Sequence, residues 1–289
     1  MRESKKILLL GTGGHCRSVA DSLIASGIYD EIALVGKPCE GKKTEEVTEN
    51  IDIVEPANIV KIEKEDKIVQ KDNLANTDKI EPADTTDKLD QSDQSDQSDQ
   101  LDQSDQSDKL DKSEEIEYMG LVEIGSEDKL STFLEEGYKF AFIAIGSIGD
   151  TSVRHTIYHK LKNIGFIIPN IIDPSSVVSK YAEFGEGVFV GKNVVINAAA
   201  KIGNCAIINT ASIIEHECEI GDYVHISPGC TICGNVRVGA DTHVGAGSVV
   251  KQGVHIGEDT MIGMGSVVLA DIGDHVIAYG NPCRIIKNK

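Results

Sequence analysis

The stretch IIEHECEIGDYVHISPG, residues 213–229, places two histidines nine residues apart, with acidic residues close to the first. An unperturbed histidine titrates near neutral pH, so His216 and His225 could serve as a catalytic pair. Histidine is also a common metal ligand, and polar residues are equally typical of the solvent-facing corners of a repeat. The register of the surrounding sequence must distinguish these three roles.

That register is a strict period of six. From Ile172 to Val268 every sixth residue is Ile, Val or Phe, the position four residues later is small or β-branched, and the position directly after is often Gly. Six is not near a multiple of 3.6, so a helix is excluded. The pattern predicts a triangular β-solenoid with three hexapeptides per coil and coils stacked roughly 4.8 Å apart. Glycine is expected to relieve a positive φ at the corners.

We number each hexapeptide from its large apolar residue, position i. His216 then lies at i+2 and Glu217 at i+3, both at outward corners, and His225 lies at i+5 of the next hexapeptide, so the core needs none of them. Gly234 follows His216 by three hexapeptides and should lie one coil further along the same edge, with its amide open to a ligand. Cys218 and Cys230 fall at i+4, which predicts buried small hydrophobes rather than thiol nucleophiles.

The chain begins differently. Residues 5–37 read as an apolar strand, a glycine turn, an amphipathic helix and a second apolar strand, and residues 118–172 resume this α/β pattern. The turn GTGGHC falls short of the full G-x-G-x-x-G fingerprint, yet a glycine turn before a helix offers N–H groups to a phosphate. A plain tight turn is the alternative.

An acidic segment separates these two parts. Residues 83–118 carry a net charge of −10, more than half of the −19 of the 289-residue chain, with Asp at every third position from Asp84 to Asp111. A period of three fits neither helix nor strand, and the segment has almost nothing to bury, which predicts disorder. Calcium binding is a weaker alternative, because the segment has no glycine turn and no defined ligand cage.

Composition narrows the class of protein. The strong negative charge argues against nucleic acid as a partner. No apolar run is long enough to span a bilayer and no signal segment follows the first residues, so we expect a cytoplasmic protein with reduced thiols and no membrane insertion.

The repeat, the start LLLGTGGHCRSVAD, the stretch INTASIIEHECEIGDYVHISPG and the ending VIAYGNPCRII together resemble the bacterial hexapeptide-repeat sugar acetyltransferases. These act on nucleotide-linked 4-amino sugars or on sialic acid. The resemblance implies an N-terminal Rossmann-like α/β domain that binds a sugar nucleotide, followed by a left-handed parallel β-helix. Residues 1–39 and 118–171 would form the first domain, 40–117 an insertion, and 172–289 the acetyltransferase domain, ending in a segment that closes the CoA groove.

The resemblance also implies roles for residues. His216 would be the general base, Glu217 the acidic neighbour that raises its basicity, and Asn209 a further residue of the same site. His225 and the amide of Gly234 would face the acetyl carbonyl, and the pantetheine arm of acetyl-CoA would run along the edge of Ala246 and Met264. Gly13, Gly14 and His15 would hold the sugar nucleotide. Related enzymes usually carry an acidic pair after the second strand, where this chain has Leu34, Val35, Gly36 and Lys37.

Other functions remain open. We expect no metal, since Cys230–Cys233 is a single C-x-x-C pair and no two histidines have the H-x-x-x-x-H spacing of the solenoid carbonic anhydrases. His225 and His243, three hexapeptides apart, should stack on adjacent coils. The expected protein is a homotrimer that N-acetylates a nucleotide-linked amino sugar, with sialic acid O-acetylation or a non-catalytic sugar-nucleotide-binding solenoid as alternatives.

Overall fold

The computed structural model describes residues 4–37 and 119–289. The insertion predicted over residues 40–117, with its expected disorder, therefore lies outside the described residues. Within the described ranges, no helix combines the length and the apolar character needed to cross a membrane.

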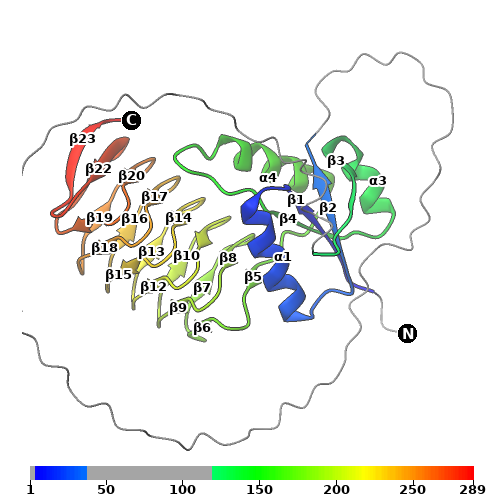
Figure 1. Cartoon of the computed structure of the whole chain (residues 1–289), viewed down its shortest axis with the longest axis horizontal. Helices are drawn as coiled ribbons and strands as arrows, with labels where there is room; N and C mark the ends of the chain where they lie inside the picture. The colour runs from blue at the N-terminus through cyan, green and yellow to red at the C-terminus, as the bar shows by residue number, and fades with distance from the viewer. Residues whose placement is uncertain (1–3, 38–118) are drawn as a thin grey trace, which may run out of the picture. The chain divides into compact units, whose positions relative to one another are not determined.

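The first part of the structure is a parallel α/β sheet with strand order β3-β2-β1-β4, as the sequence predicted (Figure 1). Strands from both sides of the insertion thus lie side by side. Alternate residues of the central strand face opposite ways: Ile7 and Leu9 pack on the side of α1, whereas Leu8 and Leu10 pack on the side of α3 and α4. The elements are β1 Lys6–Leu10, α1 Gly14–Ser26, β2 Glu31–Gly36, β3 Glu123–Ser126, the 3-10 helix η2 Glu127–Lys129, α3 Leu130–Glu135, β4 Phe140–Ile143 and α4 Ser152–Ile164.

The second part is the predicted β-solenoid, built from three sheets that we name by what they present outward. The docking sheet contains β5 Ile171–Ile172, β8 Phe189–Val190, β11 Ile207–Ile208, β14 His225–Ile226, β17 His243–Val244, β20 Met261–Ile262, β22 Val276–Tyr279 and β23 Arg284–Asn288. The apolar sheet contains β6 Val177–Val178, β9 Val195–Ile196, β12 Ile213–Ile214, β15 Thr231–Ile232, β18 Val249–Val250 and β21 Val267–Val268. The charged sheet contains β7 Glu183–Phe184, β10 Lys201–Ile202, β13 Glu219–Ile220, β16 Arg237–Val238 and β19 His255–Ile256.

The six-residue register fills the interior of the solenoid. Every sixth residue from Val190 to Val268 is at most 3% exposed, and paired strands are three hexapeptides apart in the chain. The first coil is more open, since Ile172 is 37% exposed. Cys218 and Cys230 point inward as predicted, and burial raises the pKa of both thiols to about 11. Neither thiol is therefore a ready nucleophile.

The expectation that glycine relieves a positive φ is confirmed at corner position i+3, where Gly229 and Gly247 have φ of 69° and 68°, but it is wrong for the glycines at i+1. The left-handed φ falls at position i+3, where Asn193 and Glu217 adopt φ of 55° and 59°, and not at the glycine-rich position i+1. Glycine is needed at i+1 because the next coil lies so close. A Cβ on Gly203 would come within 2.6 Å of the Asp222 nitrogen, and one on Gly239 within 2.5 Å of the Glu258 nitrogen. Stacking of the coils, rather than backbone conformation, excludes a side chain there.

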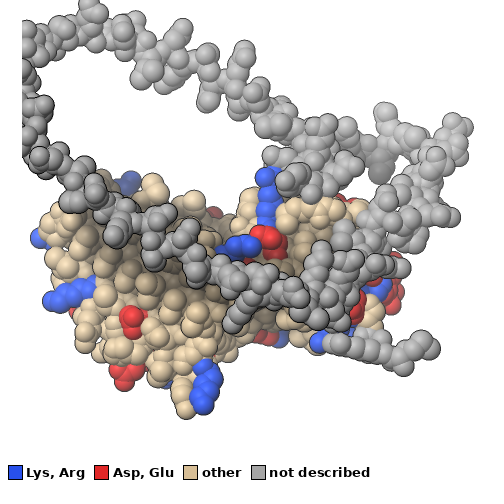
Figure 2. Space-filling model, turned by 60° about the horizontal axis from the view of Figure 1, so that its bottom comes forward, with Lys and Arg blue, Asp and Glu red and all other residues tan. Residues whose placement is uncertain are grey.

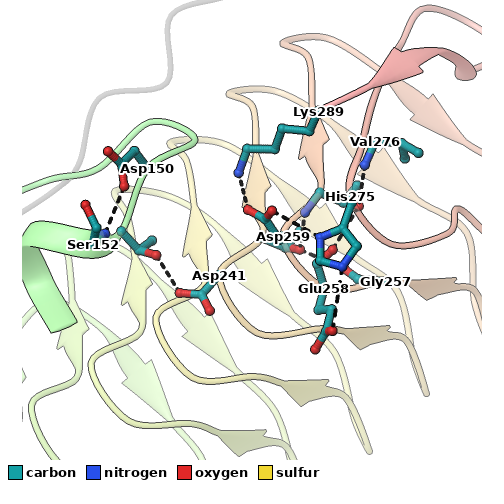
Figure 3. Close-up of polar contacts among 12 residues, drawn as sticks. Asp150, Ser152, Asp241, Gly257, Glu258, Asp259, His275, Val276 and Lys289 are labelled. Carbon is teal, nitrogen blue, oxygen red and sulfur yellow. Dashed lines mark hydrogen bonds and ion pairs between the residues drawn. The ribbon is translucent and has the colours of Figure 1, made fainter.

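The α/β part contacts the solenoid along the docking sheet and the corner that precedes it. Phe189 and Ile207 belong to the same buried cluster as α1. On the corner, Asp241 accepts hydrogen bonds from the Thr151 hydroxyl at 2.5 Å and from the His155 ring at 2.7 Å. One coil further, Asp259 contacts Lys289 and the His275 ring (Figure 3). Stacked aspartates at i+3 thus bind helix α4 and the last strand to one edge.

Candidate active site

His216 and Glu217 lie together on the corner between β12 and β13. The His216 Nδ1 atom is 3.1 Å from a Glu217 carboxylate oxygen. An ionised carboxylate only accepts hydrogen bonds, so Nδ1 carries the ring proton and Nε2 is left with its lone pair. Both side chains are more than half exposed, at 54% and 66%. This dyad can accept a proton from a group that approaches from outside the solenoid.

Gly234 lies against the His216 ring, one coil along the same edge as predicted. A Cβ at this glycine would come within 2.6 Å of both Cε1 and Nε2 of His216. The sequence suggested that glycine leaves an amide accessible. The structure adds a second reason for glycine, because the imidazole occupies the space that a side chain would need.

His225 lies in a different environment from the outward one that its register predicted. It belongs to β14 and is only 9% exposed, because the loop after β4 covers it. Its Nδ1 is 2.8 Å from the Ser147 carbonyl, and its Nε2 is 3.4 Å from the Asn209 amide nitrogen. Burial lowers its pKa, with a smaller contribution from the Arg154 charge. The structure thus groups His225 with Asn209, while His216 lies on another corner.

His15 is likewise turned toward the solenoid. Its ring meets Phe189 edge-on at 5.2 Å, and its buried Nε2 has no hydrogen-bond partner among the described residues. Burial, followed by the nearby His225 and Arg154, lowers its pKa to about 3. The exposed residues of the turn are Gly13, the N-cap of α1, and Gly14, its first residue. Their backbone, rather than the His15 ring, faces outward.

A small pocket beside this turn escaped the sequence analysis. Gly13 and Arg17 line it from the turn and α1, and Leu34 and Met119 line it from the sheet side. Met119 and Leu34 are separated by the insertion, so no local pattern links them.

Ala246 and Met264 stack on adjacent coils as predicted, with the Gly265 amide donating to the Ala246 carbonyl. Met264 is 80% exposed. Their corner joins the docking sheet to the apolar sheet, whereas the His216 corner joins the apolar sheet to the charged sheet. The apolar sheet therefore separates these two corners within one chain.

The outward face of the apolar sheet is unusually poor in charge. Its lower strands in Figure 1 are turned forward in Figure 2, where Lys, Arg, Asp and Glu are sparse over the solenoid. The outward residues are Val177, Val195, Ile213, Thr231, Val249 and Val267. The equivalent positions of the charged sheet are Glu183, Lys201, Glu219, Arg237 and His255.

Among the described residues, the His, Cys, Asp and Glu side chains form no group of three or more that could hold a metal ion. His225 and His243 do stack, with ring centroids 4.9 Å apart and near-perpendicular planes. The Nε2 atom of His243 lies 3.2 Å from the Ser227 hydroxyl.

Two family models match the chain. The PglD N-terminal domain matches residues 6–70, and the bacterial transferase hexapeptide (six repeats) matches residues 217–252 and 235–270. No curated protein matches the chain.

Solved structures extend the likeness over nearly the whole length. A perosamine N-acetyltransferase variant from Caulobacter crescentus, in complex with CoA and GDP-perosamine, is 27% identical, with 98% of this chain and 97% of that chain covered and a TM-score of 0.66. PerB from the same organism, with the same ligands, is 28% identical, with 97% of each chain covered and a TM-score of 0.65. The acetyltransferase domain of PglB from Neisseria gonorrhoeae FA1090, with acetyl coenzyme A, shares the fold at 22% identity, 98% and 100% coverage and a TM-score of 0.64. The chain thus combines a PglD N-terminal domain with bacterial transferase hexapeptide repeats, the domain pairing of a hexapeptide-repeat acetyltransferase.

Proposed function

We propose that the protein transfers the acetyl group of acetyl-CoA to the amino group of a nucleotide-linked 4-amino sugar. The observation that carries this proposal is the exposed His216–Glu217 dyad, whose Nε2 is available as a base on a solenoid corner. The relatives that bind CoA and GDP-perosamine, at 27–28% identity, support the substrate class.

In the proposed reaction His216 Nε2 takes a proton from the amine as its nitrogen attacks the thioester carbonyl. Glu217 accepts from Nδ1–H and stabilises the imidazolium that forms. The tetrahedral intermediate then expels the CoA thiolate, which receives the proton from His216, so an amide and a thiol are the products. The Gly234 amide is our candidate donor to the oxyanion.

The His216 corner and the Ala246–Met264 corner lie on opposite sides of the apolar sheet, so one chain alone does not join base and CoA edge. We propose a homotrimer in which the three chains cover one another's apolar sheets. This arrangement would bring the His216 corner of one chain to the Ala246–Met264 edge of its neighbour. A contiguous exposed apolar face is typical of an interaction surface. In a closed trimer with threefold symmetry, this face is buried on every copy.

For the acceptor, we propose that the backbone N–H groups of Gly13 and Gly14 bind the phosphates at the start of α1. Their exposure supports this. His15 would act by holding the turn against the solenoid, since its ring packs on Phe189.

The test measures release of the CoA thiol from acetyl-CoA with GDP-perosamine as the first acceptor, and with UDP-linked 4-amino sugars and sialic acid as further arms. We expect acceptor-dependent thiol release with a nucleotide-linked amino sugar and formation of its N-acetyl product. Transfer to sialic acid alone would support the O-acetyl alternative. Absence of transfer to every acceptor would contradict an enzymatic role.

A further inference from the structure

The Ser147 carbonyl defines the tautomer of His225. A carbonyl oxygen can only accept, and it lies 2.8 Å from Nδ1, so the His225 ring carries a proton on Nδ1. Burial lowers the pKa of this ring, so it is neutral at neutral pH. Nε2 then holds a lone pair and accepts hydrogen bonds.

The Asn209 amide is oriented by a separate contact. The Thr210 backbone N–H donates to Asn209 Oδ1 at 2.8 Å, which turns the Nδ2 group toward His225. The Asn209 Nδ2 to His225 Nε2 distance of 3.4 Å is that of a weak hydrogen bond in which Asn209 donates. Donor and acceptor roles therefore agree along the whole series of contacts.

We infer that His225 is a positioning residue, through which the loop after β4 orients Asn209 on the solenoid. The hydrogen bonds run from Asn209 Nδ2 to His225 Nε2, and from His225 Nδ1 to the Ser147 carbonyl. This inference rests on the proposed acetyl transfer for its effect on rate, but the tautomer itself is independent of that function.

This role replaces the direct one that the resemblance implied for His225. A neutral ring with its one proton donated to Ser147 has no second N–H to offer an acetyl oxyanion. The backbone amide of Gly234, which lies against the His216 ring, is a donor that remains near the base.

Arg154 holds the loop that carries Ser147. The residue is only 2% exposed, and its guanidinium donates to the Ser147 hydroxyl at 3.5 Å, to the Tyr223 carbonyl at 3.4 Å and to the Cys205 carbonyl. Cys205 and Tyr223 are corner residues of adjacent coils. Arg154 thus fixes the loop to the part of the solenoid that contains β11 and β14. This contact keeps the Ser147 carbonyl next to the His225 ring.

The first experiment reads the tautomer without any substrate. Two-bond ¹H–¹⁵N spectra of the full-length protein would identify the His225 ring by its loss in the His225→Gln variant. We expect the Nδ1–H form at neutral pH. An Nε2–H form or a doubly protonated ring would overturn the inference.

The second experiment is a double-mutant cycle on kcat. Asn209 lies on the same corner as the proposed CoA edge, between the docking sheet and the apolar sheet. Asparagine at 225 keeps an amide nitrogen near the position of Nδ1 but has nothing at Nε2, so His225→Asn should lower kcat roughly 10- to 100-fold by loosening Asn209 at that corner. In an Asn209→Ala background the same change should cost less than about threefold, because the partner is already gone. Losses that multiply in full would show that His225 acts on the substrate itself.

A matched control separates positioning from general damage. His243→Asn removes the same ring from the next coil of the docking sheet, at similar burial. The His243 ring meets His225 edge-on but hydrogen-bonds to Ser227 and not to Asn209. We expect a comparable loss of thermal stability and a much smaller loss of kcat. An equal loss of kcat in both variants would overturn the inference. If wild-type protein transfers no acetyl group, the proposed function fails, while the tautomer spectrum still decides the hydrogen-bond assignment.

Discussion

At the scale of single residues, the proposed base is defined by its two neighbours. Glu217 fixes the proton on Nδ1, and Gly234 provides the space in which the ring lies. The sequence predicted these three residues together because motif and register both converge on one corner. It could not predict the burial of His225, because the covering carbonyl of Ser147 is 78 residues away in the chain.

Gly234→Ala tests the packing of the ring. The new Cβ would displace His216, and a displacement of about 1 Å is enough to lower kcat roughly 100-fold. The Gly234 φ is not in the left-handed region, so stability should change little. Gly273→Ala is the control, since that solenoid glycine has no atom within 4 Å of a Cβ. Steady-state kinetics showing equal kcat for both variants would contradict the arrangement.

At the scale of elements, the docking sheet differs from an ordinary solenoid face by its row of buried histidines. His15, His225 and His243 approach one another where α1 and the loop after β4 meet β14 and β17. The hexapeptide pattern predicted each strand but not this contact, because i+5 residues face outward in every repeat and only tertiary packing determines which are covered. The same limitation explains the glycines at i+1, which are required because the next coil lies so close to them.

These histidines should make folding sensitive to mild acid. Burial lowers the pKa of His243 from 6.5 to about 4. The stabilising contribution of neutral His243 is therefore fully present above about pH 6.5. It is lost as the pH falls from about 6.5 to about 4, because in this range only the unfolded chain binds the proton. A difference of this size corresponds to on the order of 3 kcal/mol.

His243→Gln removes the titration and keeps a polar atom near Ser227. Thermal unfolding midpoints measured at about pH 7 and about pH 5 should show a smaller decrease for this variant than for wild type. His255→Gln, an exposed histidine of the charged sheet, should retain the wild-type decrease. A His243→Gln decrease equal to that of wild type would show that this ring does not resist protonation.

At the scale of the whole molecule, the two long faces that α/β elements leave uncovered have opposite character. The charged sheet alternates acidic and basic residues, whereas the apolar sheet presents a ladder of mostly Val and Ile. The residue types at position i+5 already differ in this way in the sequence. The two faces become apparent only when strands are assigned to sheets, because each sheet takes its strands from every third hexapeptide. The proposed trimer follows from that apolar face and from the two corners beside it, since the His216 corner and the Ala246–Met264 corner each hold only part of the proposed site.

Val249→Glu should break the trimer, because it places a charge in the middle of the proposed interface. Sedimentation should show smaller species, and activity should fall with assembly, since each site needs two chains. His255→Glu makes the same addition at the i+5 position of the next hexapeptide, on the charged sheet, and should leave assembly intact. A stable, fully active monomer, in wild type or variant, would rule out sites shared between chains.

The most direct test of the account is the kcat of His216→Ala with acetyl-CoA and the amino-sugar acceptor that the thiol-release assay identifies. The side chain is exposed and contributes no core contact, so circular dichroism and acetyl-CoA affinity should remain those of wild type. Loss of the general base should lower kcat by roughly 10²- to 10⁴-fold. A folded His216→Ala variant that retains near wild-type kcat would contradict the assignment of His216 as the base.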